Sequence, residues 1–260
     1  MSHLSQIKEN KSVSEKDFRS PIKNEEEINN TRLYARAFYE YIFNGKVGAP
    51  VREKLRNGAK VLEFRSDGGI WAIEVSADYP NSEFYAVDSI IPKFDNKIDN
   101  VKFIECNIFE KLPFPANEFD YIFSESKFLY MEKNTFRKVL LEIFRVLKPE
   151  GISWIKKQNI DYDISTSFEN YVKETEKAES IVYRIVETQI GSGDTEGEFL
   201  LEVIILFYKN VKDCLAPLMN ISFEEFDDLI NNFQSESNAE GSKVILKHKQ
   251  VLARKKRMYC

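Results

Sequence analysis

The first thirty residues differ in pattern from the rest of the chain. Residues 1–30 are charged and polar and carry few large apolar side chains, so burial cannot offset the entropy lost on ordering. We predict a disordered N-terminal tail there. From Thr31 onward, apolar positions recur at three- and four-residue spacing. This spacing predicts an amphipathic helix at the start of one folded domain that spans residues 31–260.

Short apolar strands then alternate with helical stripes. A stripe begins at Ile70, and the clearest one spans residues 135–147, before a stop at Lys148, Pro149 and Gly151. The strands are expected at residues 60–64, 83–88, 101–104, 119–124 and 152–156. Because strand and helix alternate, we predict an α/β fold with a Rossmann-like, mainly parallel sheet of seven strands and helices on both faces.

The last two predicted strands frame a helical insertion. Residues 181–190 and 244–253 alternate as strands, and we expect the last strand to be antiparallel to the others. Between them, the apolar positions of residues 198–218 fit a helical stripe, although FLLEVIILF alone fits a strand equally well. Ser222 and Glu225 are spaced as a capping box for a further helix. We predict helices that form a lid, inserted at about 194–240, over the carboxyl edge of the sheet.

Composition narrows the range of partners. The chain has 260 residues, 43% of them hydrophobic, and a formal charge of −5, which gives no electrostatic reason to bind nucleic acid or an anionic membrane. No stretch approaches the roughly 20 apolar residues that span a bilayer. We therefore expect an intracellular protein, cytoplasmic or nuclear, whose partner is a small molecule or a protein. Cys106, Cys214 and Cys260 contain no CxxC pair, so no metal site is predicted.

The candidate chemistry lies where parallel strands end, since open α/β sheets bind ligands at their carboxyl edge. The loop after the first strand contains Gly68 and Gly69, and a helix beginning there would offer backbone N–H groups to a carboxylate or phosphate. A turn that serves only as a turn explains the glycines equally well, and Asp67 fits the N-cap of this helix.

Two polar residues follow the next strands. Asp88 ends the second strand about 20 residues beyond the glycines, where a carboxylate can accept hydrogen bonds from both hydroxyls of a ribose. Asn107 follows the third strand, where an amide can donate to and accept from a nucleobase edge. Both residues also suit ordinary turn and loop chemistry, so the sequence leaves both interpretations open.

These segments together resemble class I S-adenosylmethionine-dependent methyltransferases of the fungal secondary-metabolism type. The resemblance implies that Glu63 helps hold the amino group of the cofactor, that Asp88 binds its ribose, and that Asn107 and Ile108 contact its adenine. It continues weakly to the C-terminal VLARKK. The runs that carry it are GAKVLEFRSDGGIWAIEVSADYPNSEFYAVD, KFIECNIFEKLPFPANEFDYIF and EIFRVLKPEGI.

The loop departs from the family pattern of Asp, any residue, Gly, Cys, Gly, any residue, Gly. Of its glycines only Gly69 is kept, while Arg65 and Asp67 replace the first two, and Glu150 replaces a glycine before the fifth strand. Arg65 can pair with the cofactor's carboxylate, whereas Asp67 would repel it. Two hypotheses follow. One is methyl transfer to a small-molecule or protein acceptor, and the other is a non-catalytic relative that kept the fold as a binding module.

Methyl transfer requires no catalytic triad, because a sulfonium methyl group is already activated and positioning supplies most of the acceleration. The sequence accordingly identifies no catalytic residue. Glu125 and Tyr130, just past the fourth strand, are placed to face an acceptor, although a loop position and the edge of the core explain them as well. His248 in the last strand is expected to be a satisfied or solvent-facing histidine rather than a base.

Overall fold

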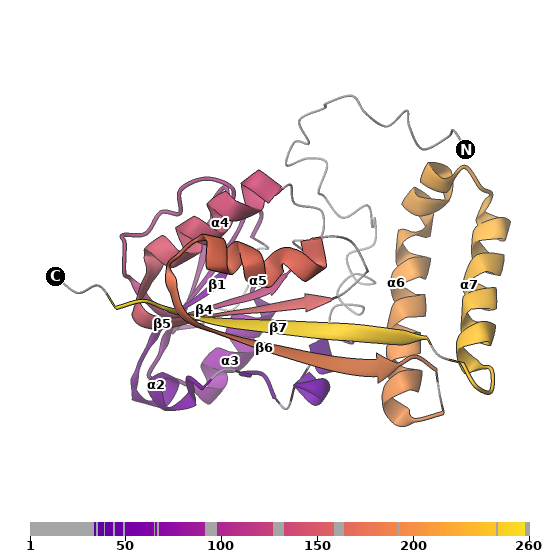
Figure 1. The fold of residues 1–260 in the computed structure, drawn as a ribbon, viewed down its shortest axis with the longest axis horizontal. Coiled ribbons are helices and arrows are strands. Elements are labelled where there is room, and N and C mark those ends of the chain that lie inside the picture. Colours follow the sequence, from indigo (N-terminus) through magenta and orange to yellow (C-terminus); the bar gives the residue numbers. More distant parts are fainter. Residues whose placement is uncertain are drawn as a thin grey trace. The chain divides into compact units, whose positions relative to one another are not determined.

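All seven predicted strands form one sheet in the order β3-β2-β1-β4-β5-β7-β6 (Figure 1). A computed structural model describes residues 34, 36–38, 40–43, 45–48, 50–64, 66, 68–91, 98–126, 133–158, 164–191, 193–242 and 244–257. The strands are β1 (Lys60–Phe64), β2 (Glu83–Asp88), β3 (Val101–Glu105), β4 (Phe119–Ser126), β5 (Leu147–Gln158), β6 (Ala178–Gln189) and β7 (Ile245–Lys255). Strands β1 to β5 pair in parallel, and β7 is antiparallel to both β5 and β6. The predicted fold class is confirmed.

Helices cover both faces of this sheet, as the alternation predicts. Helices α2 (Arg52–Asn57) and α3 (Ile70–Asp78) lie over one face, and α4 (Lys133–Val146) and α5 (Ile164–Glu174) lie over the other (Figure 1). The stripe of α4 is buried because its apolar side chains recur once per turn along the side that meets the sheet. Its buried side chains are Phe136, Val139, Leu140, Ile143, Phe144 and Val146.

The N-terminal helix is confirmed at the residues that the structure describes there, which are Tyr34, Arg36–Phe38 and Glu40–Ile42. The predicted disordered tail, residues 1–30, lies outside the described residues. Within the described part of the chain, no helix combines the length and the apolar character needed to cross a membrane.

Strand β5 begins five residues earlier than predicted. Leu147 already pairs with Phe119, while the next aligned pair is Ile152 with Tyr121. The turn predicted from Lys148–Gly151 therefore exists, but as an irregularity inside the strand rather than a break before it. Glu150 lies within it at φ +60, a left-handed conformation that explains why a glycine suits this position.

Residues 191–242 belong to a separate compact unit. Helices α6 (Thr195–Met219) and α7 (Phe223–Asn238) lie side by side in it (Figure 1). The side chain of Asp194 caps α6 by accepting from Gly197 N at 2.6 Å, and the predicted capping box of Ser222 and Glu225 starts α7. The helical assignment of residues 198–218 is thus confirmed. Their role as a lid over the sheet stays a prediction.

Candidate functional site

The carboxyl edge of the sheet brings the predicted segments together. Glu63 pairs in register with Ala86, and Phe64 with Val87, so that Asp88 follows at the same end of the neighbouring strand. Asp88 pairs in turn with Glu105 at the end of β3. The prediction that Glu63 and Asp88 share one edge is therefore confirmed by the register of β1 and β2.

Glu63 joins this edge to helix α3. Its side chain is buried, with 4% exposed, and its Oε2 accepts a hydrogen bond from the backbone N of Ala72 at 3.0 Å. Ala72 lies in the first turn of α3, where backbone N–H groups have no partner inside the helix and the helix dipole favours a negative charge. The carboxylate thus holds the start of α3 against β1. Its predicted contact with the amino group of a cofactor stays a prediction.

The loop between β1 and α3 is a tight turn. The backbone N of Ser66 donates to Val87 O at 3.0 Å, and Gly69 N donates to Ser66 O, also at 3.0 Å. Gly68 and Gly69 have φ values of +97 and +71, which residues with a side chain rarely adopt. Arg65 and Asp67, to which the sequence assigns roles toward the cofactor's carboxylate, lie outside the described residues.

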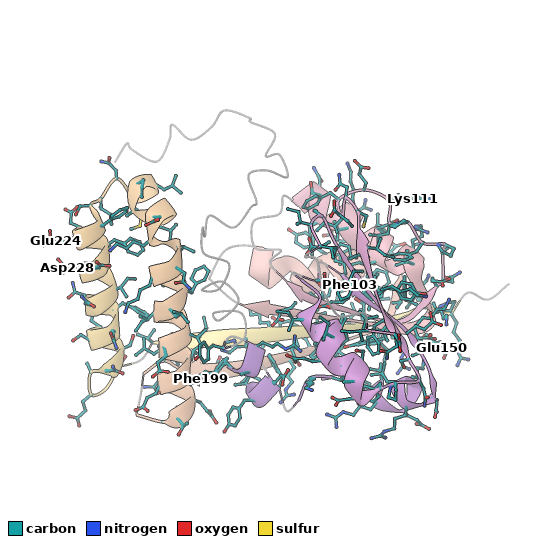
Figure 2. The ribbon with its side chains drawn as sticks, turned by 180° about the vertical axis from the view of Figure 1, so that it is seen from behind. Phe103, Lys111, Glu150, Phe199, Glu224 and Asp228 are labelled. Carbon is teal, nitrogen blue, oxygen red and sulfur yellow. The ribbon has the colours of Figure 1, made fainter. Side chains whose placement is uncertain are left out.

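Gly69 also serves packing. A Cβ atom there would lie 2.5 Å from Cε1 of Phe103, the residue labelled in Figure 2, and 3.1 Å from the Cβ of Ala86, both closer than ordinary contact. Because Phe103 is on β3 and Ala86 on β2, the glycine lets the start of α3 approach two strands directly. This is the close helix–strand packing that the last glycine of such loops provides.

Ser66 is a site residue that the sequence did not single out. Its side chain is 5% exposed, and its hydroxyl has no hydrogen-bond partner among the described residues. A buried hydroxyl without a partner is costly and calls for an explanation. A polar ligand at this loop supplies one. Serine is common in loops, so its residue type alone gives no signal.

Asp88 is partly buried at the end of β2. Its Oδ1 accepts from the backbone N of Ser89 at 2.8 Å, and its backbone O accepts from Cys106 N at 2.9 Å. Burial and the Asp88 carboxylate raise the pKa of the Cys106 thiol, so this thiol stays protonated and is a poor nucleophile. Ile90, with 59% of its surface exposed, presents an apolar surface two residues further on. The sequence analysis missed it.

The loop after β3 is occupied largely by its own contacts. Asn107 is exposed, and its Oδ1 accepts from Phe109 N while its Nδ2 donates to Glu110 Oε1, both at 3.0 Å. This is the loop chemistry that the sequence left open as an alternative. Ile108 is 3% exposed and packs in the hydrophobic core with Leu112. The adenine contacts assigned to Asn107 and Ile108 remain predictions.

The remaining candidates lie near the end of β4 and in β7. Glu125 pairs in register with Lys156, and Tyr130 lies outside the described residues. His248 is completely buried rather than solvent-facing, and its ring centroid is 5.2 Å from that of Phe38. Burial lowers the pKa of His248 to about 4, so the imidazole is neutral at neutral pH.

Comparison with known proteins adds a similarity to methyltransferases. Residues 93–203 match the family model described as a methyltransferase domain. Methyltransferase str3 of Strobilurus tenacellus is 29% identical over 103 residues, which cover 40% of this chain and 36% of that protein. Methyltransferase str2 of the same fungus is 28% identical over 103 residues, with the same two shares. The matched segment thus spans little more than a third of these relatives.

A solved structure of phosphoethanolamine N-methyltransferase 2 from Haemonchus contortus, in complex with S-adenosyl-L-methionine, aligns with 86% of this chain and 57% of that one. The identity is 16% and the TM-score 0.49. The chain is thus similar to methyltransferases over residues 93–203, a segment that covers less than half of its length.

Proposed function

We propose that this chain binds S-adenosylmethionine and transfers its methyl group to a small-molecule or protein acceptor. The proposal rests on the carboxyl edge of β1 and β2. There, Glu63 bonds to the start of α3, Asp88 ends the neighbouring strand, and the Ser66 hydroxyl has no hydrogen-bond partner in the part of the chain that the structure describes. The name methyltransferase on both fungal relatives supports it, although only part of each is matched.

The residues present suit this cofactor. Asp88 is placed to accept hydrogen bonds from the ribose hydroxyls, and the exposed side chain of Ile90 is placed to cover a nucleobase. The start of α3 offers a positive dipole end to a carboxylate, and the Ser66 hydroxyl offers a hydrogen bond beside it. Ordinary binding chemistry thus accounts for each contact without a metal ion.

The chain's part in the reaction is positioning. The bound cofactor supplies a methyl group that is already activated by its sulfonium sulfur. The protein has to hold the acceptor atom in line with that methyl group and exclude water. Glu125, at the carboxyl end of β4, lies on the same sheet face as Glu63, since Glu63 pairs with Phe123 two residues earlier. It is the described residue best placed to orient an acceptor.

Calorimetric titration tests the proposal. Wild-type protein should bind S-adenosylmethionine and S-adenosylhomocysteine at micromolar strength, about 8 kcal/mol. Asp88→Asn should weaken binding by roughly 1.5 to 3 kcal/mol, the usual contribution of a charged hydrogen bond. The matched control is Glu105→Gln, which neutralises the carboxylate paired with Asp88 in register and should leave the affinity within about twofold.

The same titration separates the two hypotheses drawn from the sequence. If Arg65 pairs with the cofactor's carboxylate, Arg65→Ala should weaken binding by a similar 1.5 to 3 kcal/mol, roughly the contribution of such a pair. Absence of any heat with wild-type protein at millimolar ligand would contradict the proposal and identify the chain as a non-catalytic binding module. Tight binding that is indifferent to Asp88 would place the cofactor elsewhere.

A further inference from the structure

A buried amide in β7 lacks hydrogen bonds. The side chain of Gln250 is 1% exposed, and in the described part of the chain neither its Nε2 nor its Oε1 has a hydrogen-bond partner. A primary amide can make four such bonds, and burying it without any is costly. Buried polar groups in native proteins are nearly always paired, so the Gln250 amide is open to a polar partner.

The sheet register places Gln250 level with the candidate cofactor site. Gln250 pairs with Lys156 of β5, which pairs with Glu125 of β4. Further along the sheet, Asp88 lies two residues beyond Ala86 and Glu125 two residues beyond Phe123, and both Ala86 and Phe123 pair with Glu63. Asp88 and Glu125 therefore occupy the same row and the same face of the sheet. One row across the carboxyl half of the sheet therefore contains Asp88, Glu125 and Gln250.

The distance along this row suits an acceptor. Adjacent strands are about 4.8 Å apart, so Gln250 lies two spacings, about 10 Å, from β4. The cofactor of the proposed function lies at the ends of β1 and β2, and β4 is the next strand from β1 toward Gln250. A molecule that reaches from β4 to Gln250 has the size of a small ring system with one polar substituent.

Two aromatic residues neighbour Gln250 on this face. Trp154 of β5 lies on the same face one pleat away, and His248 is the next residue of β7 on that face. The N-terminal segment covers them. The Phe38 ring is 5.2 Å from that of His248, and a Cβ at Gly48 would lie 2.6 Å from the Trp154 ring. Ligand pockets typically combine such apolar walls with a few polar groups that fix orientation.

We infer that Gln250 recognises the methyl acceptor, and that this acceptor is an aromatic small molecule with a carboxamide or lactam edge. An amide presents a donor and an acceptor side by side, so its best complement carries the same pair in reverse. The aromatic walls select a flat ring. This inference rests on the proposed function, because it takes Asp88 as the cofactor end of the row and Glu125 as a neighbour of the acceptor.

Benzamide is the probe that tests it. In calorimetric titration, wild-type protein should bind benzamide. Acetophenone, which has the same shape and an acceptor but no donor, should bind about tenfold or more weakly. Gln250→Met keeps the side-chain length and removes both polar atoms, so it should lose benzamide binding by a similar factor. It should not lower the melting temperature, because no hydrogen bond of the described chain is removed.

The outcomes are distinct. Failure of wild-type protein to bind benzamide, equal binding of acetophenone, or equal binding of benzamide by Gln250→Met would each overturn the inference. Titration of both proteins with S-adenosylhomocysteine tests the proposed function separately, and equal affinity is expected. If the protein binds S-adenosylhomocysteine but not benzamide, the inferred acceptor site is wrong and the proposed function still holds. Gln250-dependent benzamide binding without cofactor binding overturns the link to methyl transfer.

Discussion

Gly69→Ala tests whether the loop and helix α3 depend on the absence of a side chain. The left-handed conformation at φ +71 costs an alanine roughly 1 to 2 kcal/mol. Its Cβ would also lie 2.5 Å from the Phe103 ring, and overpacking of this kind costs typically 1 to 3 kcal/mol. The lower entropy of the unfolded alanine chain offsets about 0.4 to 1 kcal/mol. The expected loss of unfolding free energy is therefore about 1 to 4.6 kcal/mol.

The Phe103→Leu substitution separates these two contributions. It replaces the Phe103 ring that the new methyl group would meet with a smaller side chain, while the backbone strain at position 69 is unaffected. In the double variant, the loss should be smaller than the sum of the single losses by about 1 kcal/mol or more. Urea denaturation followed by tryptophan fluorescence measures all four proteins, since Trp71 belongs to α3 and is buried against the sheet.

Two results would contradict this account of Gly69. Strictly additive losses would show that α3 does not approach β3 as closely as the geometry requires. A stability unchanged by Gly69→Ala would show that the left-handed turn is absent. Because Glu63 bonds to Ala72 in the same helix, displacement of α3 should also weaken S-adenosylhomocysteine binding.

Three further substitutions test single contacts. Glu63→Gln should lower the unfolding free energy by about 1 kcal/mol, because the charge that caps Ala72 N is removed, and urea denaturation should reveal it. His248 has a pKa of about 4 in the folded protein and binds a proton more readily when the chain is unfolded. The free energy of unfolding should therefore be highest above pH 6.5 and fall by about 1.5 kcal/mol between pH 6.5 and 5. His248→Phe should abolish that part of the pH dependence, and an unchanged slope would exclude this histidine as its source. Ser222→Ala should destabilise α7 by about 1 kcal/mol in thermal melts, whereas the exposed control Ser235→Ala should not.

The sequence predicted the framework well because its strands are short, apolar and bounded by turn residues. Strands β1 and β2 begin and end where the pattern places them. Helix α6 was correctly chosen over a strand because its apolar stripe continues at helical spacing well beyond the ambiguous FLLEVIILF run. Helices α2 and α5 were not predicted. Helix α2 has only 6 residues, too few for a stripe to show, whereas α5 has apolar residues at helical spacing that were overlooked, namely Ile164, Phe168, Tyr171 and Val172.

Only those features of the candidate site that follow from the pairing register of the strands could be predicted from the sequence. Parallel pairing is sufficient to bring Glu63 and Asp88 to one edge, because both end adjacent strands. The direction of a loop side chain depends on contacts that no periodicity encodes. Ile108 therefore turned out to be core, and Asn107 to be bonded within its own loop. Gln250 gave no signal at all, because KHKQ is an ordinary polar stretch of a strand until the fold buries it.

The residues of the candidate site differ in whether the fold or a ligand explains them. Gly69, the glycine that this chain keeps, is required by packing against Phe103 and Ala86 whether or not a ligand binds. Its presence is therefore explained by the fold and cannot separate an enzyme from a binding module. Asp88 and the Ser66 hydroxyl are different: the Asp88 carboxylate accepts a hydrogen bond from the backbone of Ser89, and the Ser66 hydroxyl has no partner among the described residues. A titration that depends on Asp88 thus reports on function, whereas a change at Gly69 reports first on stability.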